Sequence, residues 1–117
     1  MAVVPFRLPD DADAVIRRAI RHRRLLAFDL KGLPRRAEPH DYGVIDGVTK
    51  LFFYQVGGRS RSGNPVGWRW AVLDEMRNIR VLEENFNGAR ETPSNRHVRW
   101  DILLASVSRT VPVPSRK

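Results

Sequence analysis

The chain has 117 residues and a mass of 13.5 kDa, enough for a single domain with one hydrophobic core. It contains no cysteine, which excludes disulfide scaffolds, zinc–thiolate sites, iron–sulfur clusters and thiol nucleophiles. Its 21 Lys and Arg residues outnumber its 13 Asp and Glu residues, and the resulting net charge of +8 attracts polyanions and small anions.

The first predicted element is a helix that begins at Asp10 and ends near Arg23 or Arg24. Apolar residues recur in it at helical spacing and form one stripe, which contains Ala12, Val15, Ile16, Ala19 and Ile20. The other faces are basic and carry Arg17, Arg18, Arg21, His22 and Arg24. Asp13 precedes Arg17 by one helical turn, so we expect these two side chains to interact.

Short strands separated by turn residues follow the helix. They are predicted over residues 25–30, 37–45, 49–56, 68–73 and 79–82. Residues 57–67, which include four glycines, are predicted to form a loop, and residues 74–76 a short turn. This order favours an α+β fold in which the helix precedes a small five-stranded antiparallel barrel.

The last predicted element fits two patterns. A helix would bury Trp100, Leu103, Leu104 and Val107, and a strand would bury Val98, Trp100, Ile102 and Leu104. A capping residue at Ser94 or Asn95 favours the helix. We expect one domain over residues 1–117, with its core within 10–108 and an unstructured tail at 109–117.

Three segments carry a family resemblance. Residues 14–28 (AVIRRAIRHRRLLAF) and 35–44 (RRAEPHDYGV) give a basic helix, a strand, and an Arg before a Pro that starts the next strand. Residues 69–76 (RWAVLDEM) align with an Arg-x-Phe-Arg-Leu-Asp-Arg-Ile segment of the same family. In their order and spacing the three segments resemble a WYL domain, over roughly residues 14–86. The eponymous Trp-Tyr-Leu is Thr-Lys-Leu here, at residues 49–51.

The resemblance implies an N-terminal helix on a Sm-like barrel of the Src-homology-3 type. The resemblance also implies a role. In many bacterial transcription regulators a WYL domain follows a winged-helix DNA-binding domain and is thought to sense nucleic acid or a nucleotide. A chain of 117 residues has no room for such a DNA-binding domain in addition, so we expect it to act alone or through a separate partner.

The loop at residues 57–67 and the strand after it form the best candidate binding site. Glycine-rich loops turn backbone N–H groups toward anions, and Arg59 and Arg61 add charge that would steer an anionic ligand. A solvated hairpin tip is the alternative interpretation of both arginines. Arg69 matches the family pattern, and strand alternation places it on the face opposite its two tryptophan neighbours. If those tryptophans are in the core, Arg69 points outward to a groove and forms the charged contact.

Two tyrosines are the preferred aromatic ligand contacts. Tyr42 and Tyr54 each have a polar tip that could reach solvent, whereas Phe52 and Phe53 are expected in the core. Arg36 belongs to a second basic cluster with Arg35 and the helix arginines, for which a solvated helix face is the alternative.

Catalysis finds little support in the sequence. His22, His40 and His97 lack metal-ligand spacing, and the serines in RSRSG lack a nucleophile-elbow context. The glycines match neither a Walker loop nor a dinucleotide fingerprint. We therefore expect no enzymatic activity, no metal and no cofactor.

The sequence thus favours a non-enzymatic sensor or regulatory domain that binds an anionic ligand, either a nucleotide or single-stranded nucleic acid, in transcription regulation or defence. The alternative is a protein–protein adaptor that docks on a separate DNA-binding subunit through an exposed sheet edge or the Trp100 segment. Neither a signal peptide nor an apolar run of membrane-spanning length is present, so a cytoplasmic protein is expected.

Overall fold

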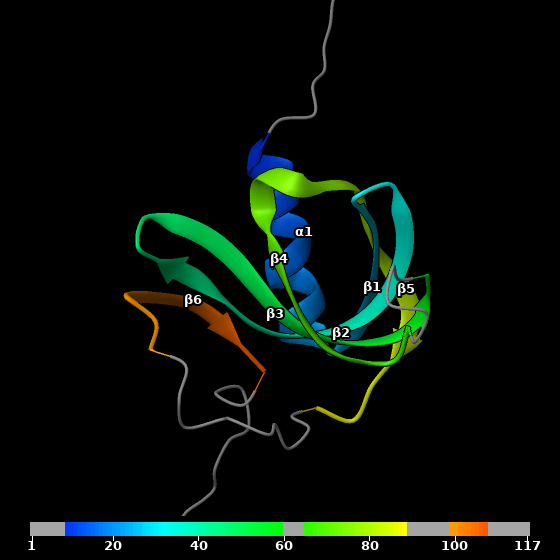
Figure 1. Cartoon of the computed structure of the whole chain (residues 1–117). Helices are drawn as coiled ribbons and strands as arrows, with labels where there is room; N and C mark the ends of the chain where they lie inside the picture. The colour runs from blue at the N-terminus through cyan, green and yellow to red at the C-terminus, as the bar shows by residue number, and fades with distance from the viewer. Residues whose placement is uncertain (1–8, 60–64, 89–98, 108–117) are drawn as a thin grey trace, which may run out of the picture.

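The computed structural model describes residues 9–59, 65–88 and 99–107 of the chain (Figure 1). Over these ranges one helix precedes a six-stranded antiparallel sheet. The elements are α1 (Pro9–His22), β1 (Arg24–Leu30), β2 (Leu33–Ile45), β3 (Val48–Gly58), β4 (Gly67–Val72), the 3₁₀-helix η1 (Leu73–Glu75), β5 (Met76–Asn85) and β6 (Ile102–Ser106).

Helix α1 forms where the apolar stripe predicts it and buries Ile16, Ala19 and Ile20 against the sheet. It stops at His22 because Arg23 takes up the left-handed conformation, with φ 54°, and donates its N–H to the Ile20 carbonyl at 3.2 Å. The predicted contact one turn apart is confirmed, since the Arg17 guanidinium donates to the Asp13 carboxylate at 3.0 and 3.1 Å.

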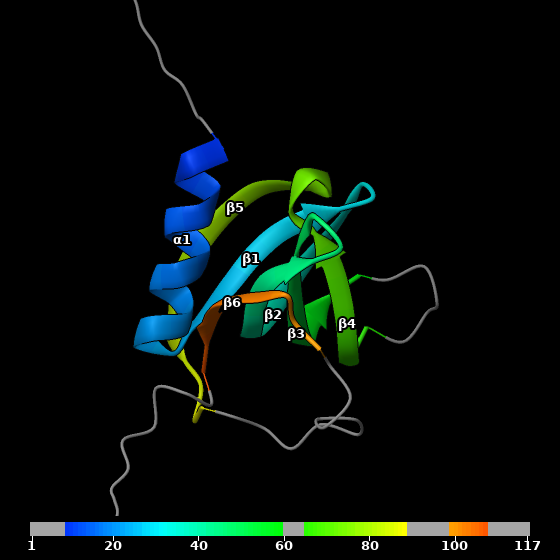
Figure 2. The ribbon, with the colours of Figure 1, turned by 90° about the vertical axis from the view of Figure 1, so that its left-hand side faces the viewer.

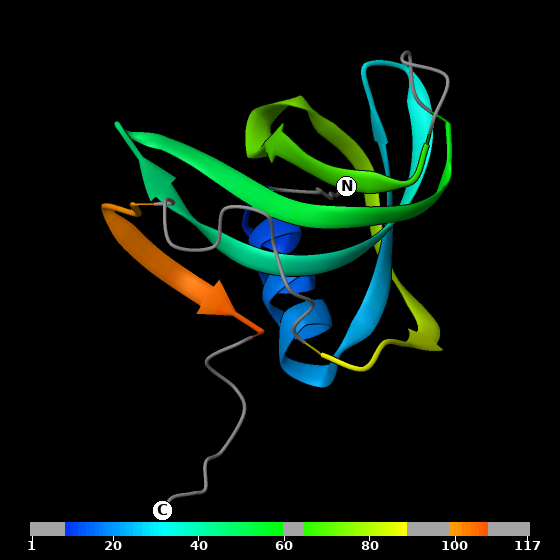
Figure 3. The same cartoon turned by 60° about the horizontal axis from the view of Figure 1, so that its bottom comes forward.

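The strands pair in the order β4-β3-β2-β1-β5, and β6 pairs with β2. Strand β2 has 13 residues, and one of its edges pairs with β1 over residues 33–37 and then with β6 over residues 41–44. Strand β3 pairs along the opposite edge of β2. Figure 3 shows β6 alongside the second half of β2, where it prolongs the row that β1 begins.

The α+β class, the N-terminal helix and the antiparallel sheet are confirmed. The sheet curves strongly, and α1 and β4 lie at opposite sides of it (Figure 2). Strands β4 and β5 stand at the two ends of this strand order. They are connected through η1 but do not pair with each other, so a closed barrel is not shown. Within the described part of the chain, no helix has both the length and the apolar character needed to cross a bilayer.

The preference for a C-terminal helix is wrong over the described residues, where β6 is a strand. Its sequence satisfies both periodicities, and tertiary pairing decides between them because the edge of β2 beyond β1 offers unpaired backbone groups. Asp41 pairs with Ser106, whose hydroxyl donates to the Asp41 carboxylate at 2.5 Å. The proposed caps at Ser94 and Asn95 and the tail at 109–117 lie outside the described residues.

The hydrophobic core lies between α1 and the inward face of the sheet. Phe28 and Phe53 meet edge to face there, with ring centroids 5.2 Å apart. Tyr42 joins this core and is 1% exposed, and its hydroxyl donates to the Asp13 carboxylate at 2.7 Å. One polar bond therefore links α1 to β2 through the core.

We predict that Tyr42→Phe lowers the free energy of unfolding by about 1.5–3 kcal/mol, because the variant loses a hydrogen bond to a charged acceptor. Urea unfolding followed by circular dichroism measures the change. The dependence on urea should keep its slope, since the surface exposed on unfolding is unchanged. An unaltered midpoint would show that this bond contributes nothing to stability.

Candidate functional site

Tyr42 is not available to a ligand in this structure. Its ring lies on the inward face of β2, and the Asp13 carboxylate on α1 satisfies the polar tip that we expected in solvent, so that expectation is wrong. Burial raises the pKa of the Tyr42 hydroxyl above its usual value of about 10, and the hydrogen bond to Asp13 raises it further.

Arg69 also lies on the inward side of the sheet. It stands directly opposite Phe53, which is 0% exposed, and directly paired residues share a face. Trp68 and Trp70 therefore lie on the outward face. Arg69 would point outward only if these two tryptophans were in the core, and they are not. Tyr54 pairs with Trp68 and is outward too, so the structure does not bring Tyr42, Tyr54 and Arg69 onto one surface.

The other predicted arginines are dispersed. Arg59 is exposed at the start of the glycine-rich loop, and Arg61 lies outside the described residues. Arg36 is half-buried and forms an ion pair with Glu84 of β5. Arg35 is buried, so the cluster predicted for Arg35, Arg36 and the helix does not form one surface.

A buried polar pair holds the base of the glycine-rich loop. Arg35 donates to the side-chain oxygen of Gln55 and to the Leu30 carbonyl, both at 3.2 Å. Gln55 in turn donates to the carbonyls of Gly57 and Arg59 at 2.9 and 3.1 Å. The loop therefore leaves the sheet from a fixed point, and the role of Arg35 here is structural.

One candidate site was not indicated by the sequence. The outward faces of β3 and β4, together with the segment before β6, carry a cluster that we term the aromatic face: Phe52, Tyr54, Trp68, Trp70 and Trp100. It holds all three tryptophans of the chain. The Phe52 ring stacks on the Trp68 ring, with their centroids 4.8 Å apart and an interplanar angle of 12°. It also packs on the Trp70 ring, with a centroid distance of 4.6 Å. Tyr54 meets Trp68 edge to face at 5.3 Å.

Trp100 extends this surface across β2. Its ring lies 5.6 Å from that of Trp70, and it covers Gly43, where a Cβ atom would come within 2.6 Å of the indole. The residue after it is anchored, since the Asp101 N–H donates to the Val44 carbonyl at 2.9 Å and its carboxylate accepts from the Asp46 N–H at 2.7 Å. Glycine at position 43 thus allows the Trp100 ring to pack directly against the backbone of β2.

The aromatic face is accessible and has a cation beside it. Trp70 is 42% exposed although it rests on the buried ring of Phe52. The Lys50 ammonium lies 5.9 Å from the Trp70 ring centroid. A supported, exposed indole next to an ammonium group suits a planar ring that carries a nearby negative charge.

A cavity of about 500 Å³ adjoins the aromatic face, and we term it the Glu38 pocket. It is lined by Leu25, Glu38, Val56, Asn85, Phe86, Asn87 and Gly88. Glu38 stands directly opposite Tyr54, so its side chain is on the outward face. His40, the extra residue of a bulge in β2, lies 4.8 Å from the Trp68 ring and 5.7 Å from the Phe86 ring, and connects the two regions.

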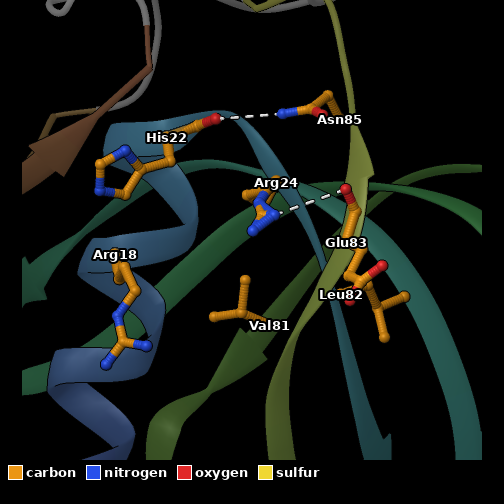
Figure 4. A pocket seen from close by; sticks show the side chains of 7 residues that line it. All are labelled: Arg18, His22, Arg24, Val81, Leu82, Glu83 and Asn85. Atoms are coloured by element: carbon orange, nitrogen blue, oxygen red, sulfur yellow. Dashed lines mark hydrogen bonds between the residues drawn. The ribbon is translucent and has the colours of Figure 1, made fainter.

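A second cavity, of about 600 Å³, is lined by residues of α1, β1 and β5 (Figure 4). Arg18 and His22 line it from α1, Arg24 from the start of β1, and Val81, Leu82, Glu83 and Asn85 from β5. Of the predicted basic cluster, this part gathers in one place. Nowhere in the described ranges are three or more His, Asp or Glu side chains grouped as a metal site would require.

The raised pKa of Tyr42 predicts a pH dependence. In the native state the Tyr42 hydroxyl keeps its proton at a pH where the same group in the unfolded chain releases it. The contribution of Tyr42 to stability is therefore complete below about pH 10 and is lost as the pH rises further. In Tyr54→Phe, Tyr42 is the only tyrosine, and its tyrosinate absorbance should appear above pH 10, together with unfolding. Titration of the folded variant near pH 10 would contradict the buried placement.

Comparisons with family models, with curated proteins and with solved structures find no match for this chain. The function is therefore inferred from the geometry of the described residues. Of these, the aromatic face with Lys50 beside it is the candidate site on which the proposal below is based.

Proposed function

We propose that this chain binds single-stranded nucleic acid and that the aromatic face is its contact surface. The observation that carries the proposal is the position of Trp70 and Trp100, two neighbouring indoles on one face of the sheet, with Lys50 beside them. Bases stack on such side chains with about 1–3 kcal/mol each, and this holds for any base.

A single strand suits this surface better than a duplex. Bases in a duplex already stack on one another, whereas those of a single strand are free to lie on aromatic rings. Lys50 is placed to contact a phosphate, and the net charge of +8 raises the association rate with any polyanion. Arg59, exposed at the end of β3, keeps its proposed role in steering the strand, while Tyr42 and Arg69 lose theirs as direct contacts.

The family resemblance is consistent with this role. The order of α1 and the strands after it agrees with a WYL domain, and we extend the proposal to a Sm-like barrel. The domain would act without catalysis, as a nucleic-acid sensor in transcription regulation or defence. A free nucleotide is the smaller ligand that the same stacking surface would accept.

One observation favours the adaptor as a second candidate function. Ile102 is 55% exposed in β6, close in sequence to Trp100, which gives an apolar surface for a protein partner. Docking through such a surface depends little on salt, whereas binding to a phosphate backbone weakens steeply as salt increases. Salt dependence therefore separates the two functions.

We predict that Trp70→Ala weakens binding of a short oligothymidylate by about 5- to 150-fold, the equivalent of one lost stacking contact. Trp70→Phe is the matched control, because it keeps an aromatic ring on Phe52 and should retain most of the affinity. Fluorescence anisotropy of a labelled oligonucleotide measures both. Equal affinities of wild type and Trp70→Ala would exclude the aromatic face as the contact surface.

A second prediction concerns the charge. Lys50→Gln should reduce the slope of log K against log salt by about 0.7, the value for one phosphate contact with a single strand. Lys31→Gln is the matched control, because it also removes one positive charge, but from the β1–β2 turn, where the Lys31 ammonium lies 3.9 Å from the Glu75 carboxylate. This variant should leave the slope unchanged. The same salt titration measures both variants. Identical slopes for Lys50→Gln and wild type would remove Lys50 from the interface.

A further inference from the structure

The cavity beside α1 has no part in the proposed function. It has a volume of about 600 Å³, and we term it the α1 cavity. Its lining comes from α1, β1 and β5 (Figure 4), whereas the aromatic face lies on the outward side of β3 and β4. Sites for small molecules have volumes of about 300–1,000 Å³. The α1 cavity therefore has the size of a ligand site of its own.

Three basic side chains line the α1 cavity. Arg18 and His22 are four residues apart in α1, so they share one face of the helix, and Figure 4 shows one above the other. Arg24 joins them from the first residue of β1. Within the described ranges neither Arg18 nor His22 forms an ion pair, whereas Arg17, elsewhere on α1, is paired with Asp13. The basic groups of this cavity therefore differ from a helix arginine that already has an acidic partner.

Hydrogen bonds hold the end of α1 against β5 at this cavity. The Asn85 side-chain amide donates to the carbonyls of His22 and Arg23, both at 3.4 Å. The Phe86 N–H also donates to the Arg23 carbonyl, at 2.9 Å. Carbonyl groups at a helix C-terminus carry negative partial charge, which repels an anion. Because two of these carbonyls already accept hydrogen bonds, less of that repulsion remains.

The balance of charge in the lining is positive. Glu83 is the acidic residue among the residues that line the α1 cavity, and it stands against two guanidinium groups and one imidazole. The Arg24 guanidinium donates to the Glu83 backbone carbonyl at 3.5 Å. A guanidinium has five N–H donors, so this contact leaves most donors of Arg24 for a ligand. The lining thus offers several hydrogen-bond donors with a positive charge behind them.

A phosphate monoester matches this lining better than a singly charged anion. Its phosphate group carries about −1.5 to −2 charges at pH 7 and has three strong acceptor oxygens, whereas a carboxylate or a phosphodiester carries one charge. The planar fork of a guanidinium pairs with two phosphate oxygens at once. Val81 and Leu82 add half-buried apolar side chains on the β5 side, which suit the organic group of an ester.

We propose that the α1 cavity binds a small organic phosphate monoester. Arg18, His22 and Arg24 contact the phosphate group, and the organic group lies against Val81 and Leu82. The inference is independent of the proposed function, because it uses none of the residues of the aromatic face. It gives the chain a second binding site, for a small phosphorylated molecule.

The test titrates three probes into ¹⁵N-labelled protein at constant ionic strength: monobutyl phosphate, inorganic phosphate and dimethyl phosphate. Monobutyl phosphate should shift the backbone signals of Arg18, His22 and Arg24 in a saturable way and leave the indole signals of Trp70 and Trp100 in place. Inorganic phosphate should bind at least about 4-fold more weakly, the equivalent of one buried CH₂ group. Dimethyl phosphate, a diester with a single charge, should bind most weakly.

Arg18→Gln is the diagnostic variant and Arg21→Gln its matched control. Both arginines are exposed on α1, so either change should preserve the fold, and each removes one positive charge. Arg18 lines the α1 cavity and Arg21 does not. Arg18→Gln should weaken binding of monobutyl phosphate about 10-fold, the equivalent of one hydrogen bond to a charged group, and Arg21→Gln should leave it nearly unchanged.

Each other outcome overturns the inference. Equal losses in Arg18→Gln and Arg21→Gln would show that net charge attracts the probe without a defined site. Equal affinities for monobutyl and inorganic phosphate would remove the organic group from the cavity, and equal affinities for monobutyl and dimethyl phosphate would remove the preference for a monoester. Shifts confined to the aromatic face would place the probe elsewhere. None of these results bears on the binding of an oligonucleotide, so the proposed function is tested separately.

Discussion

The alternation of side chains along β3, held in register against β4, is the constraint on which both faces of the sheet depend. Inward residues such as Leu51 and Phe53 join the core under α1, while outward Phe52 and Tyr54 pack against the tryptophans. A shift of register by one residue would exchange the two sets. The register that buries the core residues on one face therefore places the aromatic side chains on the other.

Some of the arginines form contacts within the fold, so net charge alone does not locate a binding site. Arg17 pairs with Asp13 on α1, Arg36 with Glu84, and buried Arg35 holds the base of a loop. Lys50 differs from these residues because its ammonium lies against the exposed ring of Trp70. Its place beside the aromatic face is the reason that the proposed contact surface includes it.

Local patterns predicted the local structure well. Helical spacing gave α1 and its Asp13–Arg17 contact, and apolar alternation gave the positions of β1 to β5. Alternation divides a strand into two sets but does not say which set faces the core, so the sequence left the side of Arg69 conditional on its tryptophan neighbours. The partner of Tyr42 lies 29 residues away on α1, and the pairing that makes β6 a strand is equally non-local. Neither is visible in a local pattern.

The most direct measurement of the central claim is a ¹H–¹⁵N correlation spectrum of the labelled protein with and without oligothymidylate. The account predicts that the indole N–H signals of Trp70 and Trp100 move on titration, since bases would stack on these rings. Backbone signals of Arg18, His22 and Arg24, at the cavity beside α1, should move little. Changes confined to that cavity, with both indole signals unmoved, would contradict the account.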